Sequence, residues 1–237
     1  MKRAWIIGNG PSLNETPLDL LRGEVSFGMN GIWRIYDRTR WRPTHYWQVD
    51  FNPRVPREEW EKGIRIHEAM GIPMALWDRM KTGYPEDHPN HKDMPVGLDK
   101  AENIPDVTWI PRCKHHVYHA GNSKGAQEWH LPEICTGYNG ISGVIQWAVS
   151  LGYGPLYLLG CDLGYKADPR LNHFDPEYNN TDDRDLSEQL QADAEAAHEL
   201  AARCSPVKIF NCTKGGDLTV YKRQNMRRIL EKKIGKW

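Results

Sequence analysis

Residues 134–165 read ICTGYNGISGVIQWAVSLGYGPLYLLGCDLGY, and their order of small, apolar and helix-breaking residues decides the fold. A turn rich in glycine, threonine and serine leads into an apolar run at 144–151, which is typical of a buried helix. Gly152 and Pro155 then stop this helix, because glycine favours a helix end and proline cannot continue one. The apolar residues 156–159 predict a buried strand, so the stretch forms a helix followed by a strand.

Both ends of this helix-strand unit carry residues suited to binding a ligand. The predicted strand ends close to Asp162, and ligands of open α/β sheets bind beyond the carboxyl ends of the strands. Thr136 and Gly137 open the predicted helix, whose N-terminal amides suit a phosphate or a carboxylate. Asp162 is therefore a candidate catalytic residue, and Thr136 and Gly137 are candidates for binding a nucleotide. Close packing of helix and strand explains the glycines equally well, so that alternative stays open.

Three more predicted strands, nearer the N-terminus, end in glycine, Asn or Asp. The sequence GNGPSL follows the apolar residues 4–7, and glycine lets backbone amides approach a phosphate closely. Asn side chains both donate and accept hydrogen bonds, as reading a nucleotide requires. The GNG turn lacks the complete fingerprint of a dinucleotide site or a P-loop, and ordinary turns also favour Asn and Asp. The candidate nucleotide-binding residues of these turns are Gly8, Asn9, Gly10, Ser12, Asn30, Asp50 and Asn52.

The repeated order of strand, turn and helix predicts an α/β, Rossmann-like fold. We expect one nucleotide-binding domain over residues 1–237, with a mostly parallel sheet and helices on both faces. Helical periodicity marks residues 58–70 and, most clearly, residues 185–204. The strands are expected at 4–8, 25–29, 45–49, 73–77, 156–160 and 207–210.

Two loop-rich stretches interrupt this pattern. Residues 81–131 are rich in Pro, Gly, His and Trp, with only 107–110 resembling a strand, which is typical of a functional insertion. Residues 163–185 are acidic, and we expect them to form a lid over the strand ends. The histidines of the insertion suggest zinc, but their spacing matches no zinc ligand set, so hydrogen-bonded loop residues or a small basic patch are favoured. The residues weighed for zinc are His88, His91, Cys113, His115, His116 and His119.

The composition shows neither an overall charge bias nor a membrane segment. Lys plus Arg equals Asp plus Glu at 31 each, so no net positive field attracts nucleic acid or an anionic membrane. No apolar run approaches the ~20 residues of a membrane span, and Met1 leads straight into a predicted strand rather than a signal-peptide core. We therefore expect a cytoplasmic protein. The five cysteines show no paired spacing and are expected to be reduced thiols.

Taken together, the turns and the 134–165 stretch resemble a known family. The features in question are GNGPSL after the first strand, an Asn after the second, an Asn-Pro after the third, and Thr-Gly followed by LGY and G-x-D. Together they are similar to the pattern of the family 42 sialyltransferases. The same layout occurs in the broader MptE-like (DUF115) group, which includes archaeal 6-hydroxymethylpterin pyrophosphokinases. The resemblance covers roughly residues 1–53 and 134–220 and leaves the insertion unmatched.

This resemblance implies a nucleotide-dependent transferase with a Rossmann-like sheet and a lid. The nucleotide is CMP-sialic acid in the sialyltransferases, and ATP with magnesium in the pyrophosphokinases. The sialyltransferases use a lid histidine as general base, and the only histidine of residues 163–185 is His173, which lies closer to Asp162 than the family pattern places it. The residues that the resemblance implies for nucleotide binding are Asn9, Gly10, Ser12, Asn30, Asn52, Thr136 and Gly137.

We expect a glycosyltransferase that moves a sugar from a nucleotide-activated donor to an acceptor hydroxyl, with no metal and no cofactor beyond the donor. His173 is the expected general base, because histidine titrates near neutral pH, and Asp162 is the second catalytic candidate. One alternative is an ATP-dependent pyrophosphokinase, in which Asp50 and Asp162 bind Mg²⁺. The other is a non-catalytic nucleotide- or glycan-binding protein. The sequence leaves open the sugar, the acceptor (a glycan, a small molecule or a nucleic acid) and whether the chain forms a homo-oligomer.

Overall fold

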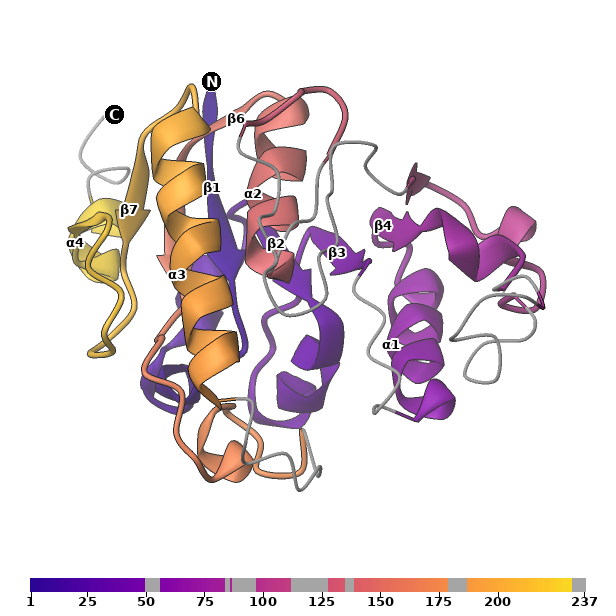
Figure 1. Ribbon diagram of the computed structural model, residues 1–237, viewed down its shortest axis with the longest axis horizontal. Coiled ribbons are helices and arrows are strands. Elements are labelled where there is room, and N and C mark those ends of the chain that lie inside the picture. The colour runs from indigo at the N-terminus through magenta and orange to yellow at the C-terminus, as the bar shows by residue number, and fades with distance from the viewer. Residues whose placement is uncertain are drawn as a thin grey trace.

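The fold is built on one parallel sheet, seen in the computed structural model, which describes residues 1–49, 56–83, 86, 97–111, 128–134, 139–178 and 187–231 (Figure 1). The sheet has eight strands in the order β5-β4-β3-β2-β1-β6-β7-β8, and every neighbouring pair is parallel. The strands are β1 (Lys2–Ile7), β2 (Ser26–Met29), β3 (His45–Gln48), β4 (Met74–Trp77), β5 (Val107–Ile110), β6 (Tyr153–Leu159), β7 (Ile209–Asn211) and β8 (Lys222–Arg223).

The strand order places a switch point beside β1. From β1 the chain adds β2 to β5 on one side of the sheet, and it then returns to add β6, β7 and β8 on the other side. In open α/β sheets the connections leave a crevice at the carboxyl ends of the strands where this reversal occurs. The pair β1 and β6 therefore marks where a ligand is expected.

Helices cover both faces of the sheet, as the sequence predicts. Alternate residues of β1 face opposite sides, so Ala4 and Ile6 belong to one buried cluster, and Trp5 and Ile7 belong to the other. The helices α2 (Gly140–Ser150) and α3 (Ser187–Cys204) pack on the first cluster, where they lie side by side (Figure 1). The helices α1 (Arg57–Ala69) and α4 (Met226–Glu231) pack on the second cluster.

One glycine of α2 has a purely structural role. A Cβ atom on Gly143 would lie 2.4 Å from Cζ2 of Trp47 on β3, so only glycine lets the helix lie this close to the sheet. The packing explanation for the glycines of the 134–165 stretch is therefore correct at this position. The side chain of Asn139 caps the helix by accepting a hydrogen bond from the Ile141 amide at 3.0 Å.

The predicted fold class is confirmed, with three local differences. The predicted insertion contributes β5 to the edge of the main sheet, and β8, a strand of two residues, was not predicted. The residues after GNG form a short 3-10 helix (Pro11–Glu15) rather than an α-helix. The residues after β2 (Asn30–Arg38) are also 3-10 helical. Within the described ranges, no helix is long and apolar enough to cross a membrane.

Candidate functional site

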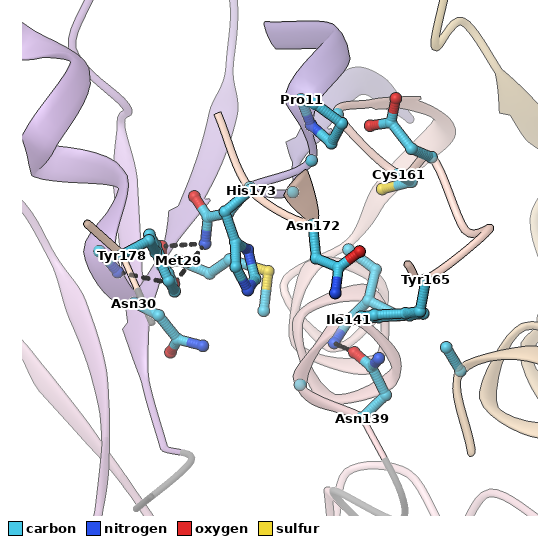
Figure 2. Close-up of a pocket in the computed structure, with 18 of the residues that line it drawn as sticks. Pro11, Met29, Asn30, Asn139, Ile141, Cys161, Tyr165, Asn172, His173 and Tyr178 are labelled. Atoms are coloured by element: carbon cyan, nitrogen blue, oxygen red, sulfur yellow. Dashed lines mark hydrogen bonds between the residues drawn. The ribbon is translucent and has the colours of Figure 1, made fainter. Parts of the chain in front are cut away.

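A cavity of about 1180 Å³ lies where β1, β2 and β6 end. Its wall is formed by the residues that follow these strands, by the start of α2, by one face of α3 and by residues from the segment 163–178. Figure 2 shows Asn30, His173 and Tyr178 on one side and Asn139 and Tyr165 on the other. Of the residues predicted from the sequence, the wall contains Gly8, Asn9, Gly10, Asn30, Asp162 and His173. Asp50, Asn52, Thr136 and Gly137 lie outside the described residues, as do the histidines and the cysteine weighed for zinc.

Asn9 presents a buried oxygen atom that no neighbour satisfies. Its Nδ2 atom donates to the Met29 carbonyl at 3.0 Å and to the Tyr178 hydroxyl at 2.9 Å. Because a carbonyl can only accept, these contacts decide which end of the amide is the nitrogen. The remaining Oδ1 atom of Asn9 has no hydrogen-bond partner among the residues that the structure describes.

Asn30 presents a second such oxygen at the end of the neighbouring strand. Its backbone has a φ of 48°, in the left-handed region that residues with side chains other than Asn and Asp rarely adopt. The Tyr46 hydroxyl donates to its carbonyl at 2.7 Å. Its Oδ1 atom is buried, and no partner for it is found in the described part of the chain. A ligand with hydrogen-bond donors would satisfy both oxygens, whereas leaving such an atom unpaired costs about 1–3 kcal/mol.

Asp162 holds the turn that follows β1. One carboxylate oxygen accepts from the Ser12 amide at 3.2 Å and the other from the Ser12 hydroxyl at 2.9 Å. Burial raises the pKa of the Asp162 carboxyl, and the hydrogen bonds from Ser12 oppose that rise. Ser12 therefore acts through Asp162 rather than from the cavity wall.

Gly10 has a structural role that the sequence did not indicate. A Cβ atom on Gly10 would lie 1.9 Å from Oδ2 of Asp162 and 2.8 Å from the Gly160 carbonyl. Gly10 is thus required by the approach of the β1 turn to the end of β6.

His173 lies in the cavity wall, but its pKa differs from the expectation. Its ring stacks on Tyr178 with the ring centroids 4.1 Å apart. Burial lowers the pKa of His173 to about 4, although a hydrogen bond with the Asn9 backbone opposes the shift. The premise that His173 titrates near neutral pH was therefore wrong. The imidazole is neutral at pH 7, so it can accept a proton, but it is a weaker base than an exposed histidine.

The segment that carries His173 is fastened to the sheet. The Phe174 amide donates to the Asn9 carbonyl at 2.9 Å, and the Asn14 side chain donates to the Phe174 carbonyl at 3.0 Å. The Tyr178 hydroxyl accepts from the Gly31 amide at 3.1 Å. This part of the predicted lid therefore contacts the turns after β1 and β2.

Tyr165 was missed by the sequence analysis. It follows β6 and lies in the cavity wall beside the start of α2 (Figure 2). Burial raises the pKa of its phenol, and a hydrogen bond from the Asn139 side chain opposes the rise. The signal was present in the sequence, because Tyr165 comes three residues after Asp162 at the same strand end.

His198 was also missed, and Tyr221 fixes its protonation. The Tyr221 hydroxyl donates its one proton to the His198 carbonyl at 2.9 Å, so at 3.2 Å the Nδ1 atom of His198 must donate to that hydroxyl. Burial lowers the pKa of His198 to about 4, which keeps the ring neutral with Nε2 as an acceptor. His198 belongs to the α3 face of the cavity wall together with Ala194 and Leu190, four and eight residues earlier. Among the described residues no group of three or more His, Cys, Asp or Glu is arranged to hold a metal ion.

Solved structures that resemble this fold include glycosyltransferases. The MAf glycosyltransferase from Magnetospirillum magneticum AMB-1 is 14% identical, with a TM-score of 0.52 over 98% of this chain, and the match covers 36% of that protein. A sialyltransferase, CST-II, in complex with a trisaccharide acceptor and CMP, is 14% identical, with a TM-score of 0.51 over 94% of this chain and 85% of its own. The sialyltransferase CstII from Campylobacter jejuni in complex with cytidine-5'-monophosphate is 16% identical, with a TM-score of 0.52 over 94% of this chain and 84% of its own.

Comparisons of sequence add nothing to this likeness, since no family model and no curated protein matches the chain. At these identities the similarity concerns the fold. The chain therefore has the parallel α/β fold that these glycosyltransferases share.

Proposed function

We propose that this protein is a glycosyltransferase that moves a sugar from a nucleotide-activated donor, of the CMP-sialic acid kind, to an acceptor hydroxyl. The observation that carries the proposal is the pair Asn9 and Asn30 in the wall of one cavity at the switch point of the sheet, where the buried Oδ1 atom of each has no hydrogen-bond partner among the described residues. A nucleotide supplies matching donors through its ribose hydroxyls and its base. The fold is that of sialyltransferases solved with CMP, which supports a cytidine nucleotide as the first ligand to test.

The residues on the two sides of the cavity suit the two halves of this reaction. The acceptor oxygen forms a bond to the anomeric carbon while the bond from that carbon to the donor phosphate breaks, and the phosphate keeps the electron pair. Tyr165 and the start of α2, across the cavity from Asn30 (Figure 2), are placed to stabilise the developing negative charge. His173, neutral at pH 7, is our candidate for accepting the proton of the acceptor hydroxyl.

A thermal-shift panel tests the nucleotide part of the proposal. The protein is heated with CMP, UMP, GMP, AMP or ATP, each with and without Mg²⁺. We expect CMP to raise the Tm without Mg²⁺, because a ligand that binds only the folded state stabilises it. The nucleotide proposal fails if none of the panel changes the Tm. Release of CMP from CMP-sialic acid, followed by chromatography, then tests for transfer chemistry.

Asn30→Gly gives a sharp variant for this panel. Glycine keeps the left-handed backbone without strain and removes the amide, so nucleotide binding should weaken while the fold persists. Lys100 provides the matched control, because it is exposed and also left-handed, with a φ of 53°. Lys100→Gly should leave nucleotide binding unchanged. Equal weakening by both variants would mean that Asn30 does not contact the nucleotide.

The same panel separates the alternatives. A pyrophosphokinase would show a shift with ATP that requires Mg²⁺. A non-catalytic binding protein would show the shift with CMP but release no CMP from the activated sugar.

A further inference from the structure

A buried aromatic cluster lies on one side of the sheet, next to the cavity. It consists of Tyr36, Tyr46 and His67, and the rings of Tyr46 and His67 stack with centroids 3.6 Å apart and planes at 7°. The rings of Tyr36 and His67 pack edge to face, with their centroids 5.7 Å apart. Tyr46 and His67 are completely shielded from solvent. The cluster is therefore rigid and has no contact with water through these two side chains.

The hydrogen bonds of His67 have only one consistent arrangement. Its Nδ1 atom lies 2.6 Å from the Gly63 carbonyl, which can only accept, so Nδ1 carries the proton. Its Nε2 atom is then the acceptor for the Tyr36 hydroxyl, at 2.6 Å. The Tyr36 hydroxyl therefore donates its proton to His67, inside the cluster.

The Tyr46 hydroxyl instead points out of the cluster toward the cavity wall. Its one proton can go to only one acceptor at a time, and the Asn30 carbonyl at 2.7 Å is closer than Oε1 of Gln48 at 2.9 Å. Both Asn30 and Gln48 line the cavity. The phenol thus links a rigid part of the core to two residues of the candidate site.

The contact with Asn30 acts on a backbone that is otherwise unfavourable. Asn30 has a φ of 48°, in the left-handed region that Asn tolerates better than most residues but less readily than glycine. Tyr46 holds the Asn30 carbonyl from the core side, while the next amide, that of Gly31, donates to Tyr178 at 3.1 Å. The peptide group between Asn30 and Gly31 is therefore hydrogen-bonded at its carbonyl and at its amide.

We propose that Tyr46 is a positioning residue for the ligand, because its hydroxyl holds the Asn30 carbonyl and with it the left-handed backbone that places the Asn30 side chain in the cavity wall. This inference rests on the proposed function, in which a nucleotide fills the cavity. Tyr46 itself does not contact the nucleotide. Its effect on binding must pass through Asn30, and this requirement makes the inference testable.

The binding test is a double-mutant cycle read by calorimetric titration with CMP. Tyr46→Phe removes one hydroxyl and should weaken CMP binding about 5- to 10-fold, the range for losing one hydrogen bond. In the Asn30→Gly background the same change should weaken binding no further. Independent effects that multiply in the double variant would overturn the inference.

Tyr36→Phe is the matched control. It removes the same group from the same cluster, but that hydroxyl bonds to His67 and not to the site. We expect Tyr36→Phe to lower the Tm about as much as Tyr46→Phe and to leave CMP affinity unchanged. If Tyr36→Phe weakens CMP binding as strongly as Tyr46→Phe, the effect is one of general stability and the inference is wrong.

A crystal structure of Tyr46→Phe tests the inference without any ligand. We expect Asn30 to leave the left-handed region or its side chain to leave the cavity wall. An unchanged Asn30 would overturn the inference. Should the wild-type protein bind no nucleotide of the thermal-shift panel, the proposed function would fail, whereas this structure would still decide whether Tyr46 positions Asn30.

Discussion

Ser12 and Asp162 join two strand ends that are 150 residues apart in the chain, through hydrogen bonds of 3.2 Å from the Ser12 amide and 2.9 Å from its hydroxyl. Ser12 follows β1 and Asp162 follows β6, the two strands at the switch point of the sheet. The contact holds the glycine turn in place beneath the cavity. Asp162 thereby has a structural duty that does not depend on catalysis.

The first prediction separates this duty from catalysis by two changes at Asp162. Asp162→Ala removes both acceptors and should lower the free energy of unfolding by about 2 kcal/mol, the range for hydrogen bonds to a charged group, with a loss of nucleotide binding. Asp162→Asn keeps one oxygen for the Ser12 amide, so binding and turnover should fall less than tenfold. Chemical denaturation and CMP titration measure the two effects. A loss of turnover of 10²-fold or more in a stable Asp162→Asn protein would instead show that the carboxylate takes part in the chemistry.

The second prediction concerns the space at Gly10. Its φ of -69° and ψ of 161° suit any residue, so the contacts with Asp162 and the Gly160 carbonyl forbid a side chain. Gly71 is the reverse case, with a φ of 64° and, apart from its chain neighbours, no atom of a described residue within 4 Å of the position that a Cβ would take. We therefore expect Gly10→Ala to destabilise the protein more than Gly71→Ala, which carries only the cost of about 1 kcal/mol for a left-handed alanine. Thermal denaturation of both variants decides this, and an equal or smaller effect at Gly10 would contradict the geometry.

The third prediction concerns the pH dependence of His173. A general base must be deprotonated, and a pKa lowered to about 4 keeps His173 deprotonated well below neutral pH. Turnover should therefore stay level between pH 8 and pH 5.5 and should not fall through pH 6.5, as it would for an exposed histidine. His173→Ala should lower turnover by about 10²- to 10⁴-fold with little change in nucleotide affinity. A variant that keeps wild-type turnover would remove His173 from the mechanism.

The sequence located the strand ends that form the site, because each signal there is local. Apolar runs followed by Gly, Asn or Asp mark the ends of β1, β2 and β6, and parallel strands bring such ends to one edge of a sheet. Asn9 and Asn30 were found in this way. The place of β5 in the sheet was less clear, since residues 107–110 are surrounded by a stretch without periodicity.

The missed features depend on contacts between distant parts of the chain. His198 reaches the cavity only because α3 packs back onto the sheet, and nothing beside it in the sequence indicates this. Tyr178 belongs to the expected lid, but its contact with Asn9 has no local signal. The pKa of His173 is set by burial, which periodicity does not reveal for a loop residue. The reason for Gly10 likewise lies in Asp162, which is its neighbour only in the folded chain.

The fourth prediction is a loss of stability in mild acid, caused by buried histidines. His67 and His198 have pKa values lowered to about 4 by burial, whereas a histidine in the unfolded chain titrates at about 6.5. Between these values the unfolded state binds more protons than the folded state, so the free energy of unfolding rises with pH. The full stability is therefore present above about pH 6.5 and is lost as the pH falls toward 4. By pH 5 each of the two histidines should have removed about 2 kcal/mol.

Urea denaturation at pH 7.5, 6.5, 5.5 and 5.0 measures this loss, and His67→Gln isolates one contribution. Glutamine does not titrate, but it can still donate to the Gly63 carbonyl and accept from Tyr36, the two contacts of His67. We expect His67→Gln to be less stable than wild type at pH 7.5, because it loses the stacking on Tyr46, and to lose less further stability by pH 5. Between pH 7.5 and pH 5, wild type should lose about 2 kcal/mol more unfolding free energy than His67→Gln. Parallel curves for the two proteins would show that His67 takes up its proton in the folded state and that its burial does not lower its pKa.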